Sequence, residues 1–248
     1  MGVTRPLAKR AFLALPKSIQ PLARYYLSGR SRKILQVTKG TVAADPCKGM
    51  RYVRQSLSSN YCPKLLGTYE MELWQATEQV VAHQHRTVID IGAAEGYYAV
   101  GFAKRPPATK VVCFEAETHE HHFLRKLATL NGVQEPIELH ALYTPMLLND
   151  ALQAERSSLV VCDVDGGEYE LLGPDAVSRL RHADILVELH DFLRPGISET
   201  IRQRFGPTHM ITLIEGRERT PQDCPLRVLG DWKEQAECMA EGRHSLQE

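Results

Sequence analysis

Two kinds of pattern are missing from this 248-residue sequence, and each absence excludes a class of protein. The six cysteines include no C-x-x-C pair, which argues against a zinc site built from cysteines. No apolar run approaches the roughly 20 residues of a membrane-spanning helix, and the N-terminus lacks the apolar core of a secretory signal. We therefore expect a soluble, cytoplasmic protein with reduced thiols.

Acidic residues are absent from the first 44 positions, which carry nine Lys or Arg. The zero net charge thus hides a basic arm and an acidic body. Because apolar residues interleave with the bases, the arm is either a helical segment packed on the body or a contact for an anionic surface such as lipid or nucleic acid. We predict a basic arm and linker over residues 1–63 and one domain over 64–248.

Beyond the linker, short apolar runs alternate with helix-compatible segments. We expect a helix from about Thr68, strands at 87–91, 110–114, 137–141, 159–163 and 184–189, and helices near 97–104, 118–131, 146–155, 168–180 and 198–205. This alternation predicts a doubly wound, mostly parallel α/β sheet. Two further runs, HMITLIEG (209–216) and CPLRVLG (224–230), predict a terminal antiparallel hairpin and about seven strands in all.

The first strand ends in the loop D90-I-G92-A-A-E95-G96, where ligands of such sheets bind. A dinucleotide fingerprint requires glycine in place of Ala94, and the Glu95 carboxylate would repel a diphosphate. The loop therefore suits a cationic ligand without phosphate, such as S-adenosylmethionine (SAM), whose amino acid end Asp90 would attract. We predict that this ligand is bound by Asp90, Gly92, Ala93, Glu95 and Gly96, with Gly92 admitting it closely and Gly96 allowing a tight start of the next helix.

The second strand ends in an acid, Glu115, 25 residues after Asp90. A carboxylate at this position accepts hydrogen bonds from both ribose hydroxyls of a nucleoside. Glu115 is therefore predicted to bind the ligand's adenosine, although by itself it does not distinguish NAD from SAM.

The last two predicted parallel strands end in clustered acids, D163-V-D165-G-G-E168 and V-E188-L-H190-D191. Such clusters are costly unless paired, solvated or functional. Together with the D90-x-G92 loop and the F114-E115 pair, they resemble the FkbM family of SAM-dependent methyltransferases from about Thr87 to Phe205. That family's pattern is D-V-E-G-x-E, so the shorter Asp165 is a departure.

The resemblance implies a class I, Rossmann-like methyltransferase that methylates a hydroxyl on a small molecule, sugar, or glycan- or lipid-linked acceptor, with Asp163 among the cofactor residues. The acceptor hydroxyl needs a base. A neutral His190, oriented by Asp191 or Glu188, is the first candidate, and Asp165 is the second.

Three alternatives remain open. A divalent metal on Asp163, Asp165, Glu188 and His190 would replace the protein base, although we do not favour it. A nucleic-acid methyltransferase would use the basic arm, against which the acidic body argues. The third is a protein of the same fold that binds a nucleotide without methyl transfer, or a dinucleotide oxidoreductase.

Overall fold

The computed structural model describes residues 29–44, 46–53, 61–105, 110–153, 157–226 and 230–241. Most of the basic arm, 1–28, and residues 54–60 of the linker lie outside this part. Among the described residues, no helix combines the length and apolarity needed to span a bilayer. All six cysteines are described, and no disulfide joins any two of them.

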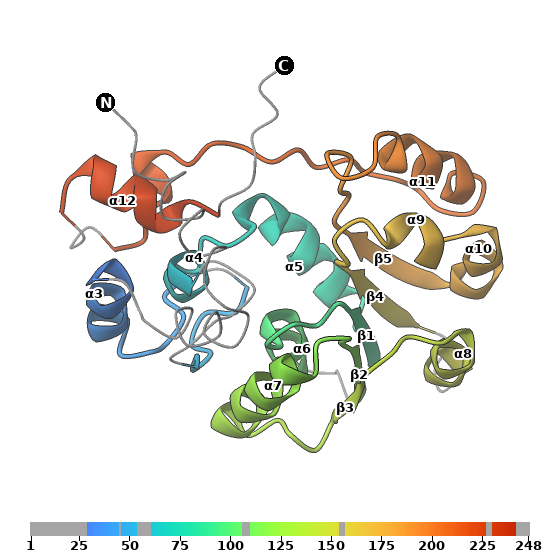
Figure 1. Cartoon of the computed structure of the whole chain (residues 1–248), viewed down its shortest axis with the longest axis horizontal. Coiled ribbons are helices and arrows are strands. Elements are labelled where there is room, and N and C mark those ends of the chain that lie inside the picture. Colours follow the sequence, from blue (N-terminus) through green and yellow to red (C-terminus); the bar gives the residue numbers. More distant parts are fainter. Residues whose placement is uncertain are drawn as a thin grey trace, which may run out of the picture.

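Five parallel strands form the central sheet in the order β3-β2-β1-β4-β5 (Figure 1). They are β1 (Thr87–Ile91), β2 (Lys110–Phe114), β3 (Ile137–His140), β4 (Ser158–Cys162) and β5 (Ala183–Val187). The chain leaves β1 in one direction towards β3 and resumes on its other side at β4, so β1 and β4 flank the switch point where ligands bind in open sheets. The predicted doubly wound parallel sheet is confirmed in these five strands.

Helices cover both faces of the sheet because side chains alternate along each buried strand. Val88 faces a core shared with α6 (Tyr97–Ala103) and α7 (Thr118–Asn131). Ile89 faces a core shared with α8 (Pro145–Gln153), α9 (Glu168–Leu171), α10 (Pro174–Leu180) and α11 (Ile197–Phe205). Gly132, left-handed at φ +70°, ends α7 where the sequence predicts.

The C-terminal segment differs from the prediction. Residues 210–220 form neither helix nor strand, and a short 3₁₀ helix, η2 (Pro221–Asp223), and α12 (Trp232–Met239) follow. Arg219 pairs with Glu72 and Glu241, which directs this segment towards the start of α5 and away from β5. The expected hairpin and seven strands are therefore wrong for the described residues, where β5 is the sheet edge and residues 227–229 are not described.

A third core joins the N-terminal helices to the sheet domain. The helices α3 (Gly29–Thr38), α4 (Tyr61–Leu66) and α12 lie together at one side of the molecule (Figure 1), and α5 (Trp74–Ala82) follows η1 (Met71–Leu73). Ile34, Leu65 and Met239 are buried in one cluster with Val100 of α6 and Leu127 of α7. The described end of the arm is thus a packed helix, and α4 begins within the predicted linker. The domain boundary at residue 63 stays a prediction.

A buried ion pair ties α4 to the loop after β1. Lys64 Nζ lies 2.9 Å from Glu95 Oε1, and the two side chains are 4% and 0% exposed. Tyr52 donates a second hydrogen bond to the same oxygen at 2.6 Å. Burial alone would raise the pKa of Glu95, but Lys64 and Tyr52 more than reverse this and hold it well below its usual range. A charge pair shielded from solvent therefore holds the loop after β1 against α4.

Replacing Lys64 by Met should lower the free energy of unfolding by about 3–5 kcal/mol, because it leaves the Glu95 charge buried without its partner. Lys33→Met is the matched control: its 2.9 Å pair with Glu234 is 42% and 30% exposed, and its loss should cost under about 1 kcal/mol. Urea unfolding measures both. Equal losses in the two variants would contradict the assignment.

Candidate functional site

The loop after β1 is held against the ends of both neighbouring strands. The amides of Gly92 and Ala93 both donate to the Phe114 carbonyl of β2, at 2.8 and 3.1 Å. Gly92 has φ +87°, and a Cβ there would lie 1.7 Å from the Asp163 carbonyl oxygen. The missing side chain thus admits protein backbone, and the close approach of a ligand to Gly92 stays a prediction.

Gly96 performs the role predicted for it at the start of α6. It is left-handed at φ +89°, and a Cβ would lie 2.8 Å from Leu124 Cγ. Ala93 is buried in the core shared with α6 and α7. Both residues shape the loop by packing, and their contact with a ligand stays a prediction.

Glu95 is engaged differently from our expectation. Its pairing with Lys64 neutralises the charge that was expected to repel a diphosphate, so this carboxylate no longer argues against dinucleotides. Its role in the described structure is to position the loop. Direct contact of Glu95 with a ligand has no support from this geometry.

Asp90 is a buried acid that lacks a full set of partners. Its side chain projects on the α6 side of the sheet, and its Oδ2 has no hydrogen-bond partner among the described residues. Burial raises the pKa of Asp90 to about 7, and the nearby Glu115 adds to the effect, against a backbone hydrogen bond with Ala99. An unpaired buried anion is costly, so this oxygen is suited to receive a cationic or hydrogen-donating group.

Glu115 bridges two loops at the end of β2. Its Oε2 accepts from the Ala94 amide and its Oε1 from the Glu117 amide, each at 2.7 Å. Ala94 is itself left-handed at φ +45°, a strain that the bond to Glu115 helps to hold. A carboxylate offers about four acceptor positions, so Glu115 retains capacity for two hydroxyl donors.

His190 is oriented by Glu168, a partner that the sequence does not indicate. Its Nδ1 lies 2.7 Å from Glu168 Oε1, which also accepts from the amides of Val164 and Gly166 at 3.2 and 3.3 Å. Asp191 instead accepts from the amides of Gly196 and Ser198 at the start of α11. The expectation that Asp191 orients the imidazole is therefore wrong.

The charge state of His190 also corrects our prediction. The hydrogen bond to Glu168 raises the pKa of His190 to about 9, against the effect of burial, and the charges of Glu168, Glu188 and Asp163 contribute in the same direction. His190 is consequently an imidazolium at pH 7. This shift disfavours the neutral base that we expected at this position, and a role of His190 as base stays a prediction.

Carboxylates surround this imidazolium at the ends of β4 and β5. Its Nε2 lies 3.7 Å from both Asp163 Oδ1 and Asp165 Oδ1, and the Asp165 side chain is 93% exposed. Burial and the nearby Glu70 raise the pKa of Asp163 to about 6, although His190 opposes them. Asp163 can therefore change its protonation state slightly below neutral pH.

Two overlapping sets of side chains at this edge have the spacing of metal ligands. Ligand atoms of Asp163, Glu168 and His190 lie within 4.8 Å of one another, as do those of Glu70, Asp163 and Glu188. The quartet predicted from the sequence does not form a single set among the described residues. Asp163 belongs to both sets and is their shared member.

Two residues from outside the predicted strand ends complete the site. Glu70 reaches the strand ends from the turn before α5, where it is left-handed at φ +47° and accepts a hydrogen bond from Tyr98. Lys64 lies 4.7 and 5.2 Å from the ring centres of Tyr69 and Tyr97. Glu70 precedes the first strand by a connection long enough for it to fold over a bound cofactor, so the sequence does indicate it as a candidate. For Lys64 the sequence offers only a charged residue within an apolar stretch.

Known proteins resemble this chain in backbone only. No protein-family model and no curated protein matches the sequence. A putative O-methyltransferase from Klebsiella pneumoniae is 16% identical over 73% of this chain and 78% of that chain, with a TM-score of 0.40. An O-methyltransferase from Bacillus cereus, solved with SAH, is 14% identical over 73% and 79%, with a TM-score of 0.39. TomG from Streptomyces achromogenes, solved with SAM, is 14% identical over 73% and 78%, with a TM-score of 0.40.

Replacing Glu168 by Gln should lower the pKa of His190 from about 9 towards its ordinary value of 6.5, because the charged acceptor is lost. In the intact protein the raised pKa of His190 stabilises the fold fully below a pH of about 6.5, and this contribution is lost as the pH rises through about 9. NMR titration of the imidazole measures the shift. Asp191→Asn is the control and should leave the pKa of His190 unchanged; an equal fall in both variants would refute the assignment.

Proposed function

We propose that the protein binds SAM at the carboxyl ends of β1 and β2 and transfers its methyl group to a hydroxyl. The observation that carries this proposal is the buried Asp90 carboxylate, which has an unpartnered Oδ2 among the described residues and a pKa raised to about 7. A nearby cation would offset the cost of burying this charge. SAM supplies two cationic groups, a sulfonium and an ammonium, and no phosphate for the surrounding carboxylates to repel.

Two parts of the ligand have a complementary residue. Asp90 would attract the amino acid end, while the free acceptor positions of Glu115 would bind the two ribose hydroxyls. Gly92, Ala93 and Gly96 would form the floor between them. Glu95 would act indirectly, since its pairing with Lys64 holds the loop in place.

The groups around Asp163 suit the proton transfer that hydroxyl methylation needs. When bound, SAM supplies a methyl group on a positively charged sulfur. Asp163 would accept the hydroxyl proton as the new oxygen–carbon bond forms and the carbon–sulfur bond breaks. Protonated His190, fixed by Glu168, would keep Asp163 ionised and in place, and the exposed Asp165 is the second candidate for the base.

The clustered carboxylates at the carboxyl ends of the strands also limit the class of acceptor. Glu70, Asp163 and Glu188 converge there, so phosphates of a nucleic acid would meet repulsion. We therefore favour a hydroxylated small molecule, sugar, or glycan- or lipid-linked acceptor, as the FkbM-like sequence pattern implies. A contact between residues 1–44 and an anionic surface remains part of the proposal.

Calorimetric titration with S-adenosylhomocysteine tests the cofactor assignment. The intact protein should show saturable binding, and Asp90→Asn and Glu115→Gln should each weaken it by about tenfold to hundredfold, since each removes a charged partner worth about 1.5–3 kcal/mol. Glu117→Gln is the matched control, because that side chain is 72% exposed and should leave affinity unchanged. No binding by the intact protein, or equal affinities in all variants, would contradict the proposal.

The pH dependence of methyl transfer tests the base. Because Asp163 must be ionised, the rate should rise with pH through about 6, and it should fall above about 9 as His190 loses its proton. A rate that rises only through about 9 would instead assign the base to His190. Asp163→Asn should lower kcat by about 10²–10⁴, whereas Glu170→Gln on the exposed side of α9 should not.

Chelation separates the protein base from a metal. If Asp163 takes the proton directly, activity should survive prolonged treatment with a chelator. Loss of turnover that added divalent ion restores would assign the activation of the hydroxyl to a metal instead.

A further inference from the structure

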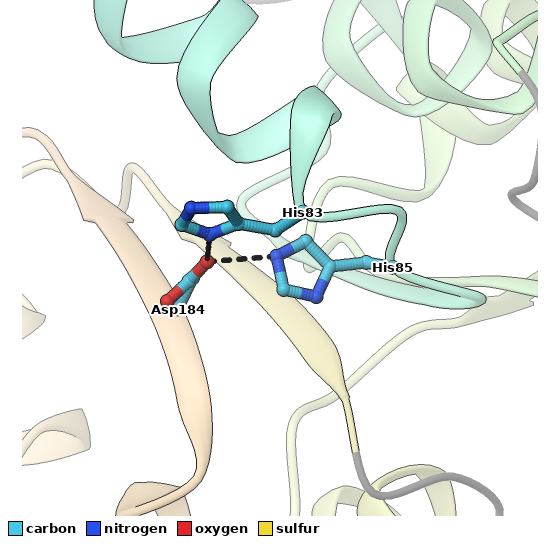
Figure 2. A group of neighbouring side chains, drawn as sticks. All are labelled: His83, His85 and Asp184. Atoms are coloured by element: carbon cyan, nitrogen blue, oxygen red, sulfur yellow. Dashed lines mark hydrogen bonds and ion pairs between the residues drawn. The ribbon is translucent and has the colours of Figure 1, made fainter.

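A second cluster of ionisable side chains lies at the opposite end of the sheet, where the strands begin. His83 and His85 belong to the connection between α5 and β1, and Asp184 is the second residue of β5. Figure 2 shows the three side chains converging from these two elements. The cluster shares no residue with the site at the carboxyl ends.

The contacts bring two imidazoles to one carboxylate oxygen. His83 Nδ1 lies 2.5 Å and His85 Nε2 lies 2.8 Å from Asp184 Oδ2. Gln84 between the two histidines is left-handed at φ +57°. This turn in the backbone accompanies the convergence of both rings on Asp184 (Figure 2).

The other ring nitrogen of His85 is also occupied. Its Nδ1 lies 2.8 Å from the hydroxyl oxygen of Ser157, next to the first residue of β4. In the structure Nε2 donates to Asp184. With an ion bound, Nδ1 would instead donate to Ser157 and the lone pair of Nε2 would bind the ion. Histidine ligands of metals commonly have this outer hydrogen bond, which fixes the tautomer and the ring orientation.

We propose that His83, His85 and Asp184 bind a divalent transition metal of the zinc class. Two imidazoles and one carboxylate form a known three-residue zinc ligand set, with a fourth position for water. The same donors are poor for Mg²⁺ or Ca²⁺, which prefer oxygen ligands. His85 is 6% exposed, whereas His83 is 61% and Asp184 37% exposed, so the ion reaches the cluster from the solvent side.

The distances allow such an ion after a small movement. Tetrahedral ligands of zinc lie about 3.3 Å apart, so the present separations of 2.5 and 2.8 Å must open by about 0.5 to 0.8 Å. The exposed ring of His83 is free to make this movement, while Ser157 holds His85. The ion would then link the start of β5 to the connection that leads into β1.

The competing explanation is a purely hydrogen-bonded cluster in which both imidazoles donate to Asp184. Burial raises the pKa of Asp184, but the bonds from His83 and His85 outweigh it and hold that pKa below its usual value. Metal titration distinguishes the two explanations, because only the first provides a saturable site.

Calorimetric titration of the metal-stripped full-length protein with Zn²⁺ tests the proposal. We expect one equivalent to bind and to raise the melting temperature by several degrees, since an ion that binds only the folded state stabilises it. His83→Ala and Asp184→Asn should each weaken binding at least tenfold. His122→Ala, an exposed histidine on α7, is the matched control and should bind as the intact protein does.

Substitution with Co²⁺ identifies the ligands independently of folding losses. A visible spectrum of tetrahedral cobalt without a thiolate charge-transfer band supports the histidine and aspartate ligands. A thiolate band would show that a cysteine binds the metal and would contradict the proposed ligands. Each variant is first shown to unfold cooperatively without metal. The absence of saturable binding, or equal affinity in the intact protein, His83→Ala and Asp184→Asn, would overturn the proposal.

Discussion

The site depends on the close approach of the loop after β1 to the end of β4. At Gly92 the Asp163 carbonyl occupies the space that any side chain would need. The same loop is held from β2, through the Phe114 carbonyl and the Glu115 carboxylate, and from α4, through Lys64 and Glu95. Parallel strands all end on the same side of the sheet, so acids that belong to separate strands meet there. The three attachments hold the loop after β1 at the same place.

The cost of burying charge determines the electrostatic properties of the carboxyl ends of the strands. The carboxylates there outnumber the nearby cations Lys64 and His190, and Lys64 is already paired with Glu95. Burial and the excess negative charge raise the pKa values of Asp90 and Asp163. The hydrogen bond to Glu168 and the nearby negative charges raise the pKa of His190 against the effect of its burial. An edge with these properties favours a cationic ligand, which is the physical basis of the SAM proposal.

The amino ends of the strands carry a different set of side chains, again because parallel strands all begin on the same side of the sheet. There the chain segments enter β1, β4 and β5, so His85, Ser157 and Asp184 meet although they lie far apart in sequence. The nitrogen donors gather at this edge, whereas the oxygen donors dominate the other. A reacting ligand and a transition metal would consequently bind at opposite ends of one sheet without competing for side chains.

Local pattern in the sequence was sufficient for the five strands, for most of the helices and for the acids at the strand ends. Short β-branched runs such as TVIDI and KVVCF are typical of central strands. The acids lie in these strands or directly after them, so chain connection alone places them at the strand ends. The pairing of these side chains could be learned only from the tertiary structure: Glu168 rather than Asp191 orients His190, and Glu95 pairs with Lys64. The same holds for HMITLIEG, whose apolar pattern predicts a strand, whereas ion pairs of Arg219 with distant acids direct the following chain elsewhere. Periodicity reports which residues are to be buried, but pKa values and pairings depend on distances between segments that no local pattern contains.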